Sequence, residues 1–216
     1  LTVVPTRDGK SYYCDGNGDF WRTYVFVERV QSFESVQSTA QAYEAGRAFG
    51  EFQALLADLP GERLHETIPH FHDTRMRFAA LKKAIQEDSH DRAQFAKPEI
   101  EFALAQEPWI GTLLDAHARG DIPERITHND TKFNNVMLDW ETGRAVCVVD
   151  LDTVMPGLVH YDFGDMVRTT TSPTLEDETD LSKVQMQMPM FKELARGYID
   201  ATRNFLTPAE KQYLAF

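Results

Sequence analysis

Two short stretches decide the fold, Ile126-Thr-His-Asn-Asp130-Thr-Lys-Phe-Asn-Asn135 and Cys147-Val-Val-Asp150-Leu-Asp152. Between them lie two β-prone segments, 135–139 and 144–149, joined by a turn whose Gly143 can adopt a positive φ. A hairpin that turns around residues 142 and 143 places Asn135 opposite Asp150 at its open end, and Asp130 lies in the loop leading into that end. We therefore expect three oxygen-bearing side chains to converge there, which suits Mg²⁺ bound together with water and phosphate oxygens.

The spacing Asp130-x-x-x-x-Asn135 is that of the H-R-D-x-x-x-x-N catalytic loop. In that loop the Asp accepts the proton of the acceptor hydroxyl, while the Asn and a later Asp hold metal ions. The chain also contains a literal Asp162-Phe163-Gly164, but this triplet follows Pro156-Gly157 and stands at the start of a predicted helix. Asp150 instead ends a strand directly after the hairpin, so the context favours Asp150 as the metal ligand and Asp162 as an N-cap.

These motifs resemble the aminoglycoside phosphotransferase and choline kinase superfamily, whose loops read H-x-D-x-x-x-x-N and whose metal-binding Asp follows a short hairpin. The resemblance implies an α+β, protein-kinase-like fold with a mostly helical C-terminal lobe and a catalytic hairpin. It implies that Asp130 is the catalytic base and that Asn135 and Asp150 hold Mg²⁺, with ATP as co-substrate. It also implies that His128 and Asp162 organise the loop.

Three further residues could contact substrate or phosphate. Lys132 either steadies the transferring phosphate or is a surface charge, and Asp152 is a second ligand, a support for the ligands or a solvated acid. Arg168 either contacts a phosphate or sugar or forms an internal ion pair with a neighbouring acid. The residues alone do not decide between these roles.

A narrower resemblance adds an acceptor. The segments 58–61, 66–74, 127–132 and 149–157, among them Glu66-Thr-Ile-Pro69-His-Phe-His72-Asp-Thr, resemble the N-acetylhexosamine 1-kinase branch of the superfamily. That resemblance implies transfer of the ATP γ-phosphate to the anomeric 1-hydroxyl of an N-acetylhexosamine. Choline, an aminoglycoside or another small alcohol is the alternative acceptor, because pocket shape rather than the catalytic motif decides the substrate.

Residues 1–30 resemble the second half of a nucleotide-binding lobe. The apolar runs on either side of Asp15-Gly-Asn-Gly-Asp19 predict a hairpin within 11–30, and Val27, Glu28 and Arg29 resemble the hinge beside adenine. No Gly-rich loop precedes Lys10. We therefore expect a residual N-lobe hairpin over 1–30 and a catalytic lobe over 31–216, both truncated, and poor kinase activity from this chain alone. A noncatalytic ligand-binding fragment is the alternative from another class.

The apolar periodicity places the helices. A helix capped by Ser38 runs to Pro60-Gly61, a second is capped by Asp73, and residues 98–118 are helical with a break at Pro108. A short strand is expected over 125–128, then helices over 162–168 and 183–205. Thr207-Pro-Ala-Glu210 is a capping box that opens the last helix.

Composition excludes several classes. The 216 residues include 22 basic and 34 acidic side chains, a net charge of −12, which disfavours nucleic-acid partners. No apolar stretch is long enough to span a membrane and no secretory signal is visible, so a cytoplasmic location is expected. Cys14 and Cys147 are expected to be buried thiols. The oligomeric state stays open. A metal-dependent hydrolase built on His70 and His72 lacks further ligands at suitable spacing.

Overall fold

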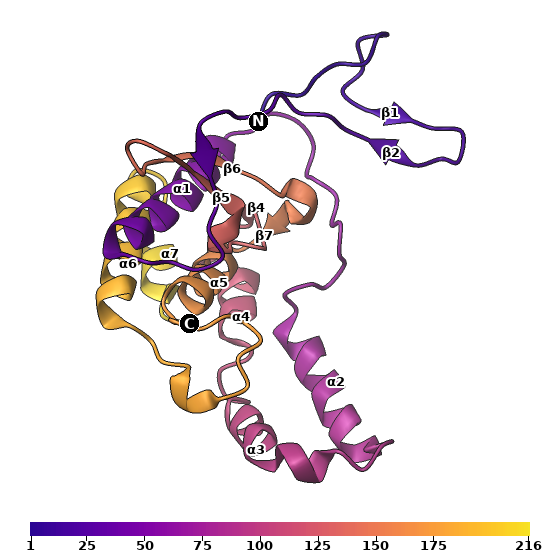
Figure 1. Ribbon diagram of the computed structural model, residues 1–216. Helices are drawn as coiled ribbons and strands as arrows, with labels where there is room; N and C mark the ends of the chain where they lie inside the picture. The colour runs from indigo at the N-terminus through magenta and orange to yellow at the C-terminus, as the bar shows by residue number, and fades with distance from the viewer. The chain divides into compact units, whose positions relative to one another are not determined.

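The computed structural model describes residues 1–216 and divides into two compact units. The first unit comprises Leu1–Phe52, Lys132–Asp150 and Met166–Ala201, and the second comprises Gln53–Thr131, Leu151–Asp165 and Thr202–Phe216. Helices α1 (Thr39–Leu56) and α5 (Val159–Thr170) contribute residues to both (Figure 1). None of the helices is both long enough and apolar enough to cross a membrane.

Two small antiparallel sheets belong to the first unit. In one, β1 (Tyr13–Cys14) pairs with β2 (Phe20–Trp21), which confirms a hairpin around the predicted turn. In the other, β5 (Val136–Asp139) lies between β3 (Val30–Gln31) and β6 (Ala145–Val148). The predicted hairpin that follows the Asp130 loop is therefore confirmed as β5–β6.

The second strand of the predicted hairpin, expected within the apolar run 20–30, is shorter than this run. Only its two ends are strand, and Val25 and Phe26 are 53% and 84% exposed. Val25 donates its N–H to Thr2 and has no neighbouring sheet to cover its side chain, so strand propensity alone does not bury this run. Cys14 is likewise exposed, against expectation, because its two-stranded hairpin has no covering layer.

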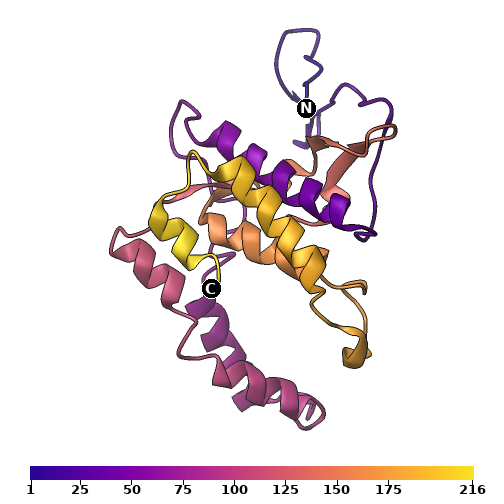
Figure 2. The ribbon, with the colours of Figure 1, turned by 90° about the vertical axis from the view of Figure 1, so that its left-hand side faces the viewer.

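Helices α1 and α6 (Met188–Thr202) pack closely within the first unit, as Figure 2 shows. A Cβ added to Gly46 would lie 2.1 Å from the Leu194 carbonyl oxygen, and one added to Gly197 would lie 2.1 Å from the Tyr43 carbonyl oxygen. The two glycines thus let the helix backbones touch. Many buried apolar side chains of this unit come from these two helices and the central strand: Ala42, Ala45, Phe49, Val136, Leu138, Leu194 and Tyr198. Phe133, before the strand, and Met166, in α5, are buried as well.

The second unit holds four further helices and one small sheet. The helices are α2 (Thr74–Glu87), α3 (Lys97–Ala105), α4 (Thr112–Ala118) and α7 (Pro208–Tyr213). Asp73 caps α2 by accepting the Met76 N–H at 2.9 Å, and the helical stretch ends before Pro108 and resumes at Thr112, as predicted. Ala116, Ile122 and Leu158 form the centre of a buried cluster here.

Strand β4 (Arg125–Thr127) confirms the short strand expected before the loop, but its partner was not predicted. Met155–Gly157 forms β7 and pairs antiparallel with β4, with Thr127 opposite Met155. The sequence Pro156-Gly157 reads locally as a break, yet a proline is tolerated in an edge strand, and both strands of this sheet are edges.

The bounds of two helices also differ from the predictions. Helix α5 begins at Val159, so Asp162 lies in its first turn and is not the N-cap. Helix α6 spans Met188–Thr202, a shorter segment than the expected 183–205. Helix boundaries depend on tertiary partners, and the Asp162 carboxylate has partners other than its own helix terminus, as described below.

The last helix is tied to β4 by an ion pair. The capping box at Thr207 is present as predicted, and Glu210 is fully buried. Arg125 donates from Nε to Glu210 Oε1 at 2.9 Å and from Nη2 to Oε2 at 3.0 Å. Burial acts to raise the pKa of Glu210, but the Arg125 guanidinium and the Thr207 N–H outweigh it and hold the pKa below its ordinary 4.5.

The helix contact in the first unit predicts that Gly197→Ala destabilises the protein by roughly 2–3 kcal/mol, because the new methyl group meets a backbone carbonyl that cannot move aside. Gly164→Ala is the matched control, since a Cβ there has no atom within 4 Å. It should be neutral or stabilise by up to about 1 kcal/mol. Urea unfolding measures both, and equal midpoints for the two variants would contradict the packing.

The buried ion pair predicts a pH-dependent stability. Because the folded-state pKa of Glu210 is lowered, its stabilisation is fully present above pH 4.5 and is lost as the pH falls through the folded value. Glu210→Gln should cost roughly 3 kcal/mol at neutral pH. The difference from wild type should shrink below pH 4.5. Urea titrations across this range test it with the exposed Glu62→Gln as control, and a difference independent of pH would be inconsistent with the pairing.

Candidate functional site

The loop that carries Asp130 follows β4 in the second unit. Asn129 has a left-handed φ of 66°, which Asn adopts more readily than most residues. Its side chain donates to the Thr127 carbonyl at 3.2 Å and to the Thr153 carbonyl at 2.9 Å, and accepts from Thr127 Oγ1 at 3.0 Å. These contacts hold the loop in a conformation that would otherwise cost free energy.

Asp162 holds the same loop from helix α5. Its carboxylate is fully buried and accepts the N–H groups of His128 at 2.9 Å and Asn129 at 2.8 Å. Gln53 Nε2 donates to it at 2.7 Å. Burial raises the pKa of Asp162 above its ordinary 3.8, and these donors and nearby His128 offset only part of that rise. The N-cap role expected for Asp162 is wrong because its oxygens bind another segment.

Further bonds fix both sides of Asp130. His128 is fully buried, and its Nδ1 lies 3.3 Å from the Asp130 N–H. The His128 carbonyl accepts from Thr153 Oγ1 at 2.6 Å. Thr131 donates its N–H to Asp165 at 2.8 Å and its hydroxyl to the Asp162 carbonyl at 2.8 Å. The half-buried Asp130 side chain is thus carried by a backbone anchored on either side.

Asn135 and Asp150 lie at one end of the β5–β6 hairpin in the first unit. The pairing predicted between them is wrong by one residue, since Val149 donates its N–H to the Asn135 carbonyl at 2.9 Å and therefore lies opposite it. The ladder shifts register between Met137 and Leu138, which local turn chemistry does not reveal. Asp150 follows Val149 with a left-handed φ of 59° and lies just beyond the end of β6.

The chemistry of these two side chains suits a magnesium ion that is bound jointly by the protein and by the phosphate oxygens of a substrate. Asn135 supplies an amide oxygen and Asp150 an exposed carboxylate, both hard oxygen donors. No group of three or more His, Cys, Asp and Glu side chains in residues 1–216 is arranged to hold a metal ion. One carboxylate and one amide match the mode in which water and phosphate oxygens complete the Mg²⁺ shell.

Lys132 and Arg168 share one carboxylate in the first unit. Glu176 lies 3.0 Å from Lys132 Nζ and 2.5 Å from Arg168 Nη1. Arg168 and then Lys132 lower the pKa of Glu176. Arg168 therefore forms the ion pair considered from the sequence, with Glu176 as partner. Lys132 is 34% exposed and is paired as well.

The remaining candidates lie at the surface. Asp152 is exposed in a 3₁₀ turn, Leu151–Thr153. Val27 is half-buried, Glu28 is exposed, and Arg29 forms an ion pair with Glu141 at the tip of the β5–β6 hairpin. The Arg29 carbonyl also accepts the Trp140 N–H at 3.0 Å, which joins the predicted hinge to that tip.

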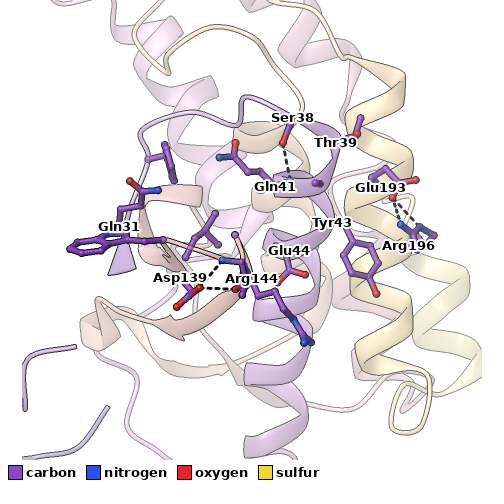
Figure 3. Close-up of a pocket in the computed structure, with 16 residues that line it drawn as sticks. Gln31, Ser38, Thr39, Gln41, Tyr43, Glu44, Asp139, Arg144, Glu193 and Arg196 are labelled. Carbon is purple, nitrogen blue, oxygen red and sulfur yellow. Dashed lines mark hydrogen bonds and ion pairs between the residues drawn. The ribbon is translucent and has the colours of Figure 1, made fainter. Parts of the chain in front are cut away.

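A hollow of about 710 Å³ lies beside α1, α6 and the β5–β6 turn in the first unit (Figure 3). No candidate residue lines it. Two of its charged groups have protein partners: Glu44 accepts the Ala145 N–H at 2.7 Å, and the Arg196 guanidinium lies 4.2 Å from the centre of the Tyr43 ring. Size alone therefore does not make this hollow the catalytic site.

Sequence reasoning missed the residues that support the loop from a distance. Gln53 and Asp165 bind the loop or its anchor, although neither belongs to the motif. Gln53 offered one signal, since it is a polar residue within the helix whose face carries Phe49, Phe52 and Leu56. A buried amide on such a face requires a hydrogen-bond partner.

Comparison with protein families identifies the class to which this fold belongs. The phosphotransferase enzyme family matches residues 11–198. The chain belongs to this family.

Solved structures support the fold. A microcompartment-associated aminopropanol kinase matches 99% of this chain with a TM-score of 0.54 and 19% identity. Together with the family match, this similarity shows the predicted protein-kinase-like α+β fold. The chain spans 62% of that kinase's length. An aminoglycoside-3'-phosphotransferase of type VIII matches 85% of this chain and 63% of its own, with a TM-score of 0.36 and 14% identity, too low to bear on the fold.

The buried carboxylate predicts that Asp162→Asn destabilises the protein by roughly 2–3 kcal/mol. An amide turned toward the N–H groups of His128 and Asn129 leaves at least one buried donor without an acceptor. Urea unfolding gives the cost. The exposed Asp177→Asn should change stability by no more than about 0.5 kcal/mol. An Asp162→Asn midpoint equal to that of wild type would show that the carboxylate does not hold the loop.

Proposed function

We propose that this protein is a small-molecule kinase that transfers the γ-phosphoryl group of ATP to an alcohol. Family membership supports phosphotransferase chemistry. The observation that carries the proposal is the anchored loop, in which Asp130 directly follows two residues whose N–H groups both bind Asp162. A loop fixed in this way can present one carboxylate to a hydroxyl group without reorganising during the reaction.

Asp130 acts in this proposal as the base that accepts the proton of the acceptor hydroxyl. His128 and Asp162 position it through the loop backbone. Asn135 and Asp150 hold Mg²⁺, which neutralises charge on the phosphate oxygens when bound. Lys132 and Arg168 are secondary candidates for phosphate contact, which would require each to exchange Glu176 for a phosphate oxygen. Asp152 is a candidate for positioning the metal ligands. The candidate hinge beside adenine is formed by Val27, Glu28 and Arg29.

The proposed acceptor is a sugar hydroxyl, with the anomeric 1-hydroxyl of an N-acetylhexosamine as the first choice. The motifs around Glu66–Thr74 and Val149–Gly157 support this choice. The main alternative is another small alcohol, and the similarity to an aminopropanol kinase makes 1-amino-2-propanol a necessary member of any substrate panel. Choline and aminoglycosides complete the panel.

The decisive experiment is Mg-ATP turnover with this panel, performed on the longest form of the protein that carries the sequence. Asp130→Asn should lower kcat at least about a thousandfold, because the amide cannot accept the proton, while ATP affinity changes little. Asp177→Asn, an exposed acid outside the loop, is the control and should retain wild-type turnover.

Two results would overturn the proposal. Retention of turnover by Asp130→Asn would remove Asp130 from the reaction. Absence of phosphoryl transfer to every acceptor, with ligand binding intact, would instead favour a noncatalytic ligand-binding protein.

A further inference from the structure

Four consecutive backbone N–H groups in the loop around Asp130, those of residues 128 to 131, donate to side chains. Their acceptors are Asp162 for His128 and Asn129, His128 Nδ1 for Asp130, and Asp165 for Thr131. Backbone N–H groups inside a protein need acceptors, and here side chains supply them in place of a strand or helix ladder. The conformation of the loop is therefore determined by the few side chains that accept these bonds.

The two acidic acceptors come from one face of helix α5. Asp162 and Asp165 are three residues apart, a spacing that places their side chains on the same side of a helix. Asp162 is fully buried and binds the two N–H groups that precede Asp130. Asp165 is half-buried and binds the N–H of the residue that directly follows Asp130. The two carboxylates thus hold the loop on opposite sides of the proposed base.

The contact between Thr131 and Asp165 is the shorter of the two that flank Asp130 directly. The Thr131 nitrogen lies 2.8 Å from Asp165 Oδ2, and the Thr131 hydroxyl oxygen lies 3.2 Å from the same atom. On the other side, the Asp130 nitrogen lies 3.3 Å from His128 Nδ1, a longer and weaker contact. Thr131 is itself fully buried. Asp165 therefore provides the firmer of the two contacts beside Asp130.

The direction of the Asp130 side chain depends on the two peptide groups that flank its Cα atom. Because each peptide group is planar, the orientations of both planes determine the direction of the Cα–Cβ bond between them. The N–H of Asp130 belongs to the first plane and the N–H of Thr131 belongs to the second. Asp165 binds the second plane directly, so it controls the torsion that follows the Asp130 Cα atom.

We infer that Asp165 is a positioning residue for Asp130, which it orients through the Thr131 N–H, and that its contribution depends on the place of its oxygen rather than on its charge. The inference rests on the proposed function, since the orientation of a base matters only to a reaction. It adds to that function a residue that touches neither ATP nor the acceptor.

Three substitutions at Asp165 separate the shape of this side chain from its charge. Asp165→Asn keeps an oxygen acceptor at the same distance from the backbone and removes the charge. Asp165→Glu keeps the charge but moves the carboxylate by one methylene group. Asp165→Ala removes the acceptor. A positioning role predicts that the asparagine variant is more active than the glutamate variant, whereas an electrostatic role predicts the opposite order.

The test is Mg-ATP turnover by the longest form of the protein that carries the sequence, with N-acetylglucosamine first and then the other members of the acceptor panel. Asp165→Ala and Asp165→Glu should lower kcat about tenfold to a hundredfold, because a displacement of about 1 Å can have an effect of that size. KM for ATP and for the acceptor should change less than about threefold, since neither ligand contacts Asp165. Asp165→Asn should restore kcat to within about threefold of wild type.

Two controls accompany the kinetics. Asp177→Ala removes an exposed acid outside the loop and should leave kcat and both KM values unchanged. Urea midpoints identify any variant that does not fold, and if Asp165→Ala is among them, the comparison of Asp165→Asn with Asp165→Glu decides alone. Amide hydrogen exchange at Thr131 measures the contact without turnover and should be at least about tenfold faster in Asp165→Ala than in wild type.

Four results overturn the inference and leave the kinase standing. They are a wild-type kcat in folded Asp165→Ala, a glutamate variant more active than the asparagine variant, a raised KM with kcat unchanged, and unchanged exchange at the Thr131 amide. A wild-type protein that transfers phosphate to no member of the panel overturns the proposed function itself, and the positioning role with it. The absence of wild-type turnover therefore distinguishes that failure from the other four.

Discussion

The buried Asp162 carboxylate is the constraint on which the loop around Asp130 depends. A carboxylate without water is costly to bury, and here three donors from two distant segments compensate it: the N–H groups of His128 and Asn129 and the side chain of Gln53. Two of those donors belong to the loop, so the buried Asp162 carboxyl group and the ordered loop require each other. The Thr131 hydroxyl adds a bond to the backbone of the same residue.

This arrangement explains why Asn129, which is not a glycine, adopts a left-handed conformation next to Asp130. Asn129 precedes Asp130 with a φ of 66°, and Asp150 itself has a φ of 59°. Such conformations persist only where neighbouring contacts fix them. For Asn129 the contacts are visible, with bonds to the carbonyls of Thr127 and Thr153 in addition to the Asp162 bond to its N–H. The hydrogen bonds that orient the loop therefore also offset the free-energy cost of the left-handed conformation of Asn129.

Sequence patterns predicted the features that local chemistry controls. The Asp73 cap, the Thr207 capping box and the β5–β6 hairpin each depend on a few neighbouring residues, and the structure contains all three. The register of the hairpin depends on a bulge, which local patterns do not reveal. Strand β7 depends on its partner β4, which is distant in the sequence, so β7 was not predicted either. Local patterns gave Asp162 only an N-cap role, whereas the family resemblance gave it a role in organising the loop. Its hydrogen-bond partners come from elsewhere in the chain, where local patterns cannot find them.

The same distinction separates what the motif can specify from what the pocket must specify. The spacing from Asp130 to Asn135 describes a reaction, and it would serve any acceptor hydroxyl equally well. The choice of acceptor requires binding surfaces outside the motif, whose shape and hydrogen-bonding groups differ between enzymes that share it. An acceptor that fits such a surface poorly is also positioned poorly for the reaction. Recognition and chemistry are therefore linked even though different residues determine them.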